Sequence, residues 1–303
     1  MNEPICKYMK TGIVHFMAFP ETAGGEGPIL DTIRRIAEDE YFGAIELTHI
    51  KDPAIRARAR DLLDTARVTV AFGAQPILLS GRLNINDTDE KKRQEATAVM
   101  KEALDEAVGL GACGFAFLSG RYEEKTKEAS YKSLVRSTME LCSYAKSLGD
   151  IKVVHEIFDY NVDKKSLIGP ACLALRYARE ITAEYDNFGL MVDLSHLPLI
   201  GEAPKEAIEP IKDYIVHAHI GNCVVKDSSL PGYGDLHPRF GFPGGENDVT
   251  EVMVYLKTLL DIGFLDPKAP PIVSFEVKPF GAESSEMVIA NAKRTLDRAW
   301  ALL

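Results

Sequence analysis

Two histidines, His217 and His219, lie two residues apart at the end of an apolar run. On a β-strand, side chains two residues apart point to the same face, so both imidazoles would point to one side. Three other apolar runs each end in an acid, at Glu156, Asp193 and Glu276. Our central hypothesis is that these three acids and His219 meet around one divalent metal ion.

The donor atoms of such a site indicate its chemistry. Two glutamates, an aspartate and a neutral imidazole would give a mostly oxygen-donor site with a charge of about −3, which suits Mn²⁺ first and also Mg²⁺, Co²⁺ or Zn²⁺. A sugar carbonyl and its neighbouring hydroxyl could complete the coordination, and the cation would then stabilise an enediolate. The two glutamates could remove and return the proton beside the carbonyl, while Asp193 and His219 hold the ion.

These residues need strands that deliver them to one place, and the chain alternates strand-like and helix-like segments. Strands are predicted at residues 12–19, 44–49, 68–75, 113–118, 152–156, 189–193, 214–220 and 272–277. Helices are predicted at residues 28–40, 53–66, 89–110, 125–148, 165–185, 204–211, 249–262 and 284–302. Strands separated by helices run parallel, and eight such units close into a barrel with its active site at the carboxyl ends of the strands. We therefore predict an α/β fold, a single (β/α)8 TIM barrel over residues 1–303.

The histidines support a site at that end. All seven fall in or just after predicted strands, or in strand-to-helix loops, and none falls in a predicted helix. Structural histidines would be expected on helices as well. Any one histidine could still be a hydrogen-bonded core residue, so the argument rests on their joint pattern with the three acids.

Composition limits the function classes. With 46% hydrophobic and 26% charged residues, the 303-residue chain is typical of a globular protein, and its net charge of −10 opposes nucleic-acid binding. Five scattered cysteines without a CxxC pair are typical of reduced thiols in the cytoplasm. No apolar run is long enough to span a bilayer or to form a signal-peptide core. We expect a cytoplasmic protein that binds neither nucleic acid nor membrane.

The order Glu156, Asp193-Leu-Ser-His196, His217-Ala-His219 and Glu276 resembles the xylose-isomerase-like TIM-barrel superfamily, especially its sugar isomerase and epimerase branch. The resemblance covers essentially the whole chain. It implies that the four predicted ligands bind a divalent metal, that Glu156 and Glu276 act as acid and base, and that His196 contacts the substrate. That substrate would be a small sugar or sugar derivative, and homo-oligomers are common among such barrels.

The chain departs from the resembling ketose epimerases in two places. Residues 158–162 contain no glutamate and residues 222–226 contain no arginine, although those epimerases carry these residues there. A long loop at residues 226–248 follows the seventh strand instead. Loops of this length are usually lids or binding loops, so we expect His237 and Arg239 to reach the substrate. The alternative is that the loop forms an oligomer contact.

Four further residues are weaker candidates for substrate binding. Lys278 shares a strand face with Glu276, but it could merely pair with an acid. Glu46 on the second strand might equally pair with an arginine or lysine, and the amide of Gln75 at the end of the third strand could bind a hydroxyl. His15 could line the pocket wall, as could His49. By contrast, His155 alternates with Glu156 and is expected to face the helices.

Three function classes therefore remain open. The first is a metal-dependent sugar isomerase or epimerase, which suits proton transfer next to a carbonyl. The second is a metal-dependent lyase of the same fold, either a dehydratase or a subunit that cleaves C-glycosides. The third is a non-catalytic barrel that binds a ligand or a partner protein.

Overall fold

The computed structural model describes residue 1 and residues 3–303. In this part of the chain, eight parallel strands form one sheet with the spatial order β1-β8-β7-β6-β5-β4-β3-β2. The strands are β1 (Lys10–Ile13), β2 (Ala44–Leu47), β3 (Thr69–Gly73), β4 (Gly114–Leu118), β5 (Lys152–Glu156), β6 (Phe188–Asp193), β7 (Ile215–Gly221) and β8 (Ile272–Glu276). A bridge between Val14 and Glu46 joins the β1 and β2 sides, so the sheet is a nearly closed barrel. The predicted (β/α)8 architecture is confirmed.

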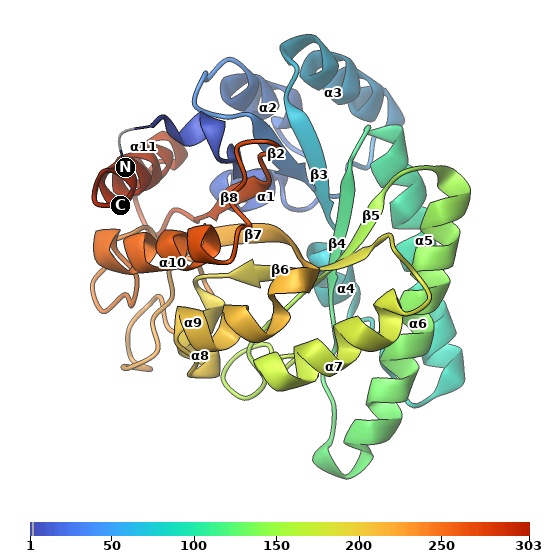
Figure 1. The fold of residues 1–303 in the computed structure, drawn as a ribbon. Helices are drawn as coiled ribbons and strands as arrows, with labels where there is room; N and C mark the ends of the chain where they lie inside the picture. Colours follow the sequence, from blue (N-terminus) through green and yellow to red (C-terminus); the bar gives the residue numbers. More distant parts are fainter. Residues whose placement is uncertain (2) are drawn as a thin grey trace.

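Helices surround this barrel (Figure 1). The α-helices are α1 (His15–Ala18), α2 (Ile29–Ala37), α3 (Pro53–Ala66), α4 (Gln75–Gly81), α5 (Glu90–Gly109), α6 (Lys127–Leu148), α7 (Ala171–Thr182), α8 (His196–Ile200), α9 (Pro204–Ile208), α10 (Val249–Asp261) and α11 (Ser285–Ala301). Short 3₁₀ helices lie at η1 (Ile5–Lys7), η2 (Pro20–Thr22), η3 (Glu124–Thr126) and η4 (Glu209–Tyr214). Within the described residues, no helix has both the length and the apolarity needed to cross a membrane.

Side chains on the strands alternate between two cores. Ala116, Val154 and Met191 form a small buried cluster of their own. The two sequence neighbours of Ala116, Phe115 and Phe117, belong to the large cluster that packs the sheet against the helices. This alternation is the period-two pattern of a strand covered on both faces. Because the barrel interior is filled in this way, the strands hold the polar residues rigidly at their carboxyl ends.

The loop at residues 226–248 is pinned at its base by the buried side chain of Asn222. Its Oδ1 accepts hydrogen bonds from the backbone N–H groups of Cys223 (2.9 Å) and Asn247 (2.8 Å). Its Nδ2 donates to the carbonyl oxygen of Arg239, at 3.0 Å. The side chain that follows β7 therefore ties the middle and the end of the loop to the end of that strand.

The structure corrects several predicted elements. The predicted strand at residues 12–19 is too long, because β1 ends at Ile13 and His15 begins α1. A short apolar run fits a strand or a buried helical turn equally well, so periodicity could not separate the two. Gln75 was predicted to end a strand, but it begins α4, which has proline in its first turn. The helix predicted from residue 165 begins only at Ala171, directly after Pro170.

The prediction that no histidine lies in a helix was also wrong. His15 and His196 are the first residues of α1 and α8. Both helices are short and follow β1 and β6 closely, so these histidines still lie near the carboxyl ends of their strands.

Candidate active site

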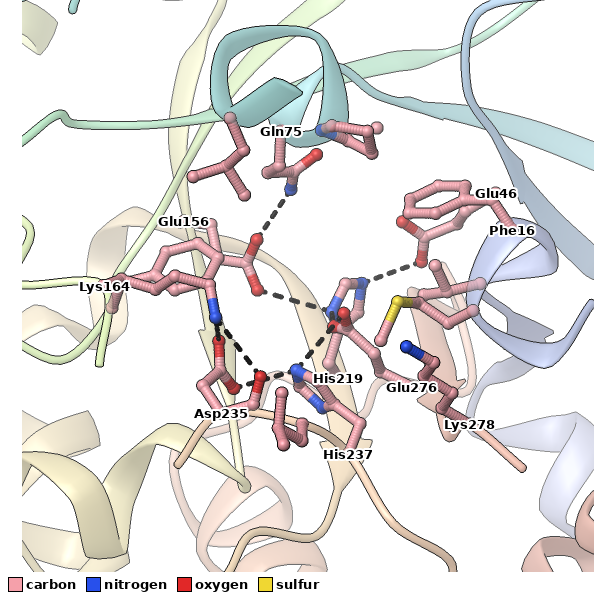
Figure 2. A pocket seen from close by; sticks show the side chains of 17 residues that line it. Phe16, Glu46, Gln75, Glu156, Lys164, His219, Asp235, His237, Glu276 and Lys278 are labelled. Carbon is pink, nitrogen blue, oxygen red and sulfur yellow. Dashed lines mark hydrogen bonds and ion pairs between the residues drawn. The ribbon is translucent and has the colours of Figure 1, made fainter. Parts of the chain in front are cut away.

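The four predicted ligands come together at the carboxyl end of the barrel. Glu156, Asp193 and Glu276 are the last residues of β5, β6 and β8, and His219 lies near the end of β7. One ligand atom from each lies within 4.8 Å of the others. Figure 2 shows Glu156, His219 and Glu276 facing a common space. Four adjacent parallel strands therefore bring together side chains that are far apart in the sequence.

His219 lies at the centre of this group. Its Nδ1 is 2.7 Å from Glu276 Oε2, 3.5 Å from Glu156 Oε1 and 3.9 Å from Asp193 Oδ2. The side chain of Glu276 is 13% exposed, and the other three are almost fully buried. The ring nitrogen and three carboxylates thus surround a space that is closed to bulk water on most sides.

Two oxygen atoms of this group fit a bound cation. Glu156 Oε1 and Asp193 Oδ2 are buried and have no hydrogen-bond partner among the described residues. The second oxygen of each carboxylate is already held, since Gln75 Nε2 donates to Glu156 Oε2 (2.6 Å) and Ser195 N–H donates to Asp193 Oδ1 (2.7 Å). An unpaired buried carboxylate oxygen is costly, and a cation offsets that cost. The donor set therefore suits a divalent metal ion.

Glu46 orients the histidine ligand from behind. Its Oε1 lies 2.9 Å from Nε2 of His219 and 2.7 Å from Nε2 of His217. When Nε2–H donates to Glu46, Nδ1 keeps its lone pair for a metal, which is the usual arrangement of a metal-bound histidine and its carboxylate partner. The alternative that Glu46 pairs with an arginine or lysine is wrong, because histidines take that place.

The charges of the site are strongly coupled. Although burial disfavours charge on His219, the charge of Glu46 and the contacts with Glu156 and Glu276 raise its pKa well above the usual value. Burial raises the pKa of Asp193. A proton on His219 and a cation would compete for the same carboxylates, so metal binding is expected to release a proton.

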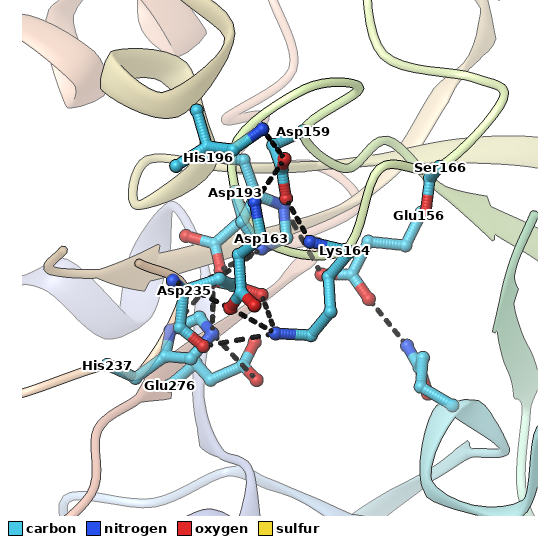
Figure 3. A network of polar contacts seen from close by, with 12 residues as sticks. Glu156, Asp159, Asp163, Lys164, Ser166, Asp193, His196, Asp235, His237 and Glu276 are labelled. Atoms are coloured by element: carbon cyan, nitrogen blue, oxygen red, sulfur yellow. Dashed lines mark hydrogen bonds and ion pairs between the residues drawn. The ribbon is translucent and has the colours of Figure 1, made fainter. Parts of the chain in front are cut away.

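A second polar cluster, centred on the buried Asp235 of the long loop, adjoins three of the predicted ligands: Glu156, Asp193 and Glu276 (Figure 3). Asp235 Oδ2 lies 3.0 Å from Lys164 Nζ. Asp235 Oδ1 lies 3.1 Å from His196 Nε2 and 2.8 Å from His237 Nε2. Burial would raise the pKa of Asp235, but the cations of His237, His196 and Lys164 hold it well below the usual value. Asp235 therefore connects the loop after β7 to the loop after β5.

His237 joins this cluster to the predicted ligands. Its Nε2 lies 3.4 Å from Glu276 Oε1, and its Nδ1 lies 3.9 Å from Asp193 Oδ2. Lys164 and Asp235 were not among the sequence candidates. In the sequence, only their positions in the loops after β5 and β7 could have indicated a role at the site. No hydrophobic period relates residues in irregular segments, so their contact could not be predicted.

A cavity of about 200 Å³ opens onto Glu156, His219 and Glu276. Of the predicted substrate residues, four line it: Glu46, Gln75, His237 and Lys278. The cavity is also lined by residues that the sequence did not single out: Phe16, Lys164, Asp235 and Leu236. The long loop thus supplies part of the cavity wall.

The other predicted substrate residues lie elsewhere. His15 Nε2 is 2.8 Å from Thr32 Oγ1, and burial lowers its pKa to about 3, so the ring is neutral. Arg239 Nε donates to Glu283 Oε1 at 2.7 Å. His196 donates from Nδ1 to the carbonyl oxygen of Ile157 (2.7 Å) and lies behind the cavity wall.

Two further histidines clarify the pattern. His49 is not among the residues that line the cavity. Its Nδ1 lies 2.6 Å from Oε2 of Glu106, a residue of the outer helix α5. His155 packs against Phe117 and Tyr177 with ring centroids 4.9 Å apart in both pairs, which confirms its predicted structural role.

Comparisons with known proteins agree with this architecture. A D-psicose 3-epimerase from Clostridium cellulolyticum H10, solved with D-tagatose, is 17% identical with a TM-score of 0.68, covering 97% of this chain and 98% of that chain. A D-tagatose 3-epimerase-like protein is 20% identical with a TM-score of 0.71, covering 96% and 98%. The IOLI protein with a binding zinc atom is 18% identical with a TM-score of 0.71, covering 96% and 98%. At these identities the likeness shows a shared fold.

Sequence comparison identifies the family of the chain more directly than the structural likeness does. No curated protein sequence gives a significant match. Residues 30–277, however, match the family described as the xylose isomerase-like TIM barrel. Because this match spans most of the chain and the structure has the same architecture, the protein belongs to the xylose isomerase-like TIM barrel family.

Proposed function

We propose that the protein is a divalent-metal-dependent sugar epimerase or isomerase, which transfers a proton next to a carbonyl through an enediolate. The observation that carries this proposal is the pair of unpartnered buried oxygens, Glu156 Oε1 and Asp193 Oδ2, beside His219 and Glu276 at the mouth of a cavity. The names of its structural neighbours, which include several sugar 3-epimerases, support this reaction class.

The ion would be held by Glu156, Asp193, Glu276 and Nδ1 of His219. Manganese is our first choice for this mostly oxygen-donor set, ahead of magnesium, cobalt and zinc. A zinc atom in the neighbouring IOLI protein supports a divalent ion without deciding which. When bound, such an ion supplies a Lewis acid that stabilises negative charge on a substrate oxygen.

The protein's own residues would move the proton. Glu156 and Glu276 come from strands separated by β6 and β7, so they approach the cavity from different directions and can serve as acid and base. The amide of Gln75 holds Glu156 Oε2, and the other oxygen, Oε1, lies 3.5 Å from Nδ1 of His219. Lys278 and Lys164 line the same cavity and can bind substrate hydroxyls or carbonyl oxygens.

The remaining expectations belong to this proposal. We infer that the ligand is a small sugar or sugar derivative and that the protein acts in the cytoplasm. The net charge of −10 opposes binding to nucleic acid. A homo-oligomer stays a prediction from the family resemblance.

The test is proton exchange in deuterated water. The Mn²⁺-loaded protein should exchange the proton beside the carbonyl of a ketohexose and form an epimer or isomer, followed by NMR. Glu156→Gln keeps the shape of the side chain but removes the proton-accepting charge, so exchange should fall by about 10²–10⁴-fold. The matched control is Glu106→Gln, a buried glutamate that contacts His49 outside the cavity and should leave exchange unchanged.

Other outcomes separate the alternatives. Unchanged exchange in Glu156→Gln would contradict the proposed mechanism. Loss of water from the ketohexose without an epimer, or release of the aromatic group from an aryl C-glycoside offered in its place, would favour the lyase. No exchange with any of the four metals and any ketohexose would favour a binding protein.

A further inference from the structure

A second cavity adjoins the one above the predicted metal ligands. It has a volume of about 650 Å³ and lies between α4, the loop after β4 and the loop after β5. The two cavities share three lining residues: Leu79, Lys164 and Leu236. In Figure 2, Lys164 lies on the side of the cavity opposite Glu46 and Lys278. The two cavities therefore adjoin at these three residues.

The volumes favour an occupant that uses both cavities. Small-molecule sites typically measure roughly 300–1,000 Å³. The first cavity, at about 200 Å³, lies below this range, whereas the second lies within it. A compact sugar moiety suits the first cavity, and a larger group attached to it suits the second.

The walls of the second cavity have an apolar and a cationic part. The apolar part comes from leucine side chains, including Leu79 at the junction of the two cavities. Leu79 is 46% exposed. Apolar surface at such a position is stabilised when an apolar group of a ligand covers it.

The cationic part consists of Arg82 and Arg121. Arg82 follows α4 in a left-handed conformation (φ 51°), and neither arginine forms an ion pair within the described residues. Arg121 donates from Nε to the carbonyl oxygen of Lys164 (3.1 Å) and from Nη2 to that of Asp163 (3.3 Å), so backbone contacts hold it in place.

The carboxylate in the second cavity is already paired. Asp163 Oδ2 lies 3.0 Å from Lys164 Nζ. Arg82 and Arg121 therefore give the cavity an excess of positive charge in a protein whose net charge is −10. Arginine favours carboxylate and phosphate groups, because its planar donors match two oxygens of the anion.

We propose that the substrate is a sugar conjugate rather than a free monosaccharide. The sugar moiety occupies the cavity at Glu156 and Glu276, and a ring-sized, largely apolar substituent with an acidic group occupies the second cavity. The apolar body covers Leu79, and the acidic group meets Arg82 and Arg121. The placement of the sugar moiety rests on the proposed function, whereas the second cavity and its arginines do not.

The test measures affinity rather than turnover. Methyl, phenyl, 4-carboxyphenyl and 4-phosphonophenyl glycosides of several hexoses would be titrated into the Mn²⁺-loaded protein by calorimetry. The phenyl form should bind about threefold more tightly than the methyl form, because the ring covers apolar surface. The better of the two acidic forms should bind about tenfold more tightly than the phenyl form, and the comparison shows which anion the arginines favour.

The chain offers a matched control for the arginine. Arg82→Glu should reduce the ratio of acidic to phenyl affinity to about one or below. The control is Arg67→Glu. Arg67 is an exposed arginine that follows α3 in the same left-handed conformation (φ 55°), but it lies outside the cavity. This substitution should leave every glycoside affinity unchanged. Leu79→Ala alters an exposed side chain, so it should fold and lose the phenyl advantage.

Two results would overturn the proposal. One is equal affinity for all four glycosides of each hexose, including the absence of measurable binding. The other is an effect of Arg82→Glu no greater than that of Arg67→Glu. This test can fail independently of the test of the proposed function. Proton exchange on free ketohexoses together with equal affinities for the glycosides would refute only the proposal of a conjugated substrate. Graded affinities without exchange on free ketohexoses or on conjugates that keep a free sugar carbonyl would refute only the epimerase.

Discussion

Replacing Glu46 by glutamine tests whether the two histidines of β7 are held for metal binding. Glu46 Oε1 lies 2.7 Å from His217 Nε2 and 2.9 Å from His219 Nε2, and the side chain is buried. Glutamine keeps the size of the side chain and one acceptor oxygen, but it removes the negative charge. The substitution therefore weakens two contacts without opening a cavity.

The expected magnitude follows from these contacts. A hydrogen bond to a charged group contributes about 1.5–3 kcal/mol, compared with about 0.5–1.5 kcal/mol for a neutral one. His219 would lose part of its orientation and some of the basicity of Nδ1. Removing such a partner of a metal-bound histidine typically lowers metal affinity 10- to 100-fold, which corresponds to about 1.4–2.7 kcal/mol. We expect Glu46→Gln to lower Mn²⁺ affinity by that amount.

The assay is a competition titration of Mn²⁺ against a chromophoric chelator, with bound metal counted by mass spectrometry. Glu106→Gln is the control, because this buried glutamate also contacts a histidine, at 2.6 Å, but lies outside the cavity. Its metal affinity should equal that of the unmodified protein. Unchanged affinity in Glu46→Gln, or an equal loss in Glu106→Gln, would refute the inference that Glu46 orients a metal ligand.

Three further predictions concern stability. Burial lowers the pKa of His237, but the charges of Glu276 and Asp235 outweigh this and raise it from 6.5 to about 9. The contribution of His237 to the free energy of unfolding is therefore fully present below pH 6.5 and is lost as the pH rises through about 9. In urea unfolding of the chelator-treated protein, His237 should therefore contribute a loss of about 3 kcal/mol across that window, and His237→Gln should reduce the total loss by about that amount. Asp235→Asn leaves neighbouring cations unpaired and should cost about 3–5 kcal/mol in the same assay; a change below about 1 kcal/mol would contradict the network. In Gly12→Ala, the new Cβ would lie 2.3 Å from Ser274 Oγ, which should cost about 1–3 kcal/mol, and adding Ser274→Ala should restore most of it.

The sequence was sufficient to predict that Glu156, Asp193, His219 and Glu276 come together, because their positions follow from topology alone. Each ends or nearly ends an apolar run, and parallel strands in a barrel bring their carboxyl ends to one place. For each strand, the prediction only has to decide which side chain at its end points into the barrel. The period-two alternation of side chains along a strand decides this. His155 was assigned to the outer face for the same reason, and it packs there against Tyr177.

Residues outside the strands could not be placed in this way. Arg239 was expected to reach the substrate, yet it pairs with Glu283, because a charged side chain in a loop pairs with whichever acid the backbone brings near. Gln75 begins a helix rather than ending a strand, but its amide still reaches Glu156. The contact between Lys164 and Asp235 joins two irregular loops, and no sequence period relates them.

The loops also explain how a family site can take a different substrate. This chain lacks the glutamate at 158–162 and the arginine at 222–226 that resembling ketose epimerases carry. Lys164, from the loop after β5, and His237, from the loop after β7, line the cavity and both contact Asp235. Since the strands position the four predicted metal ligands and the loops build part of the cavity wall, substitutions in the loops should alter substrate choice while leaving metal affinity nearly unchanged. Metal affinity and sugar affinity should therefore separate in variants of Lys164, and a proportional loss of both would show that the loops support the metal site itself.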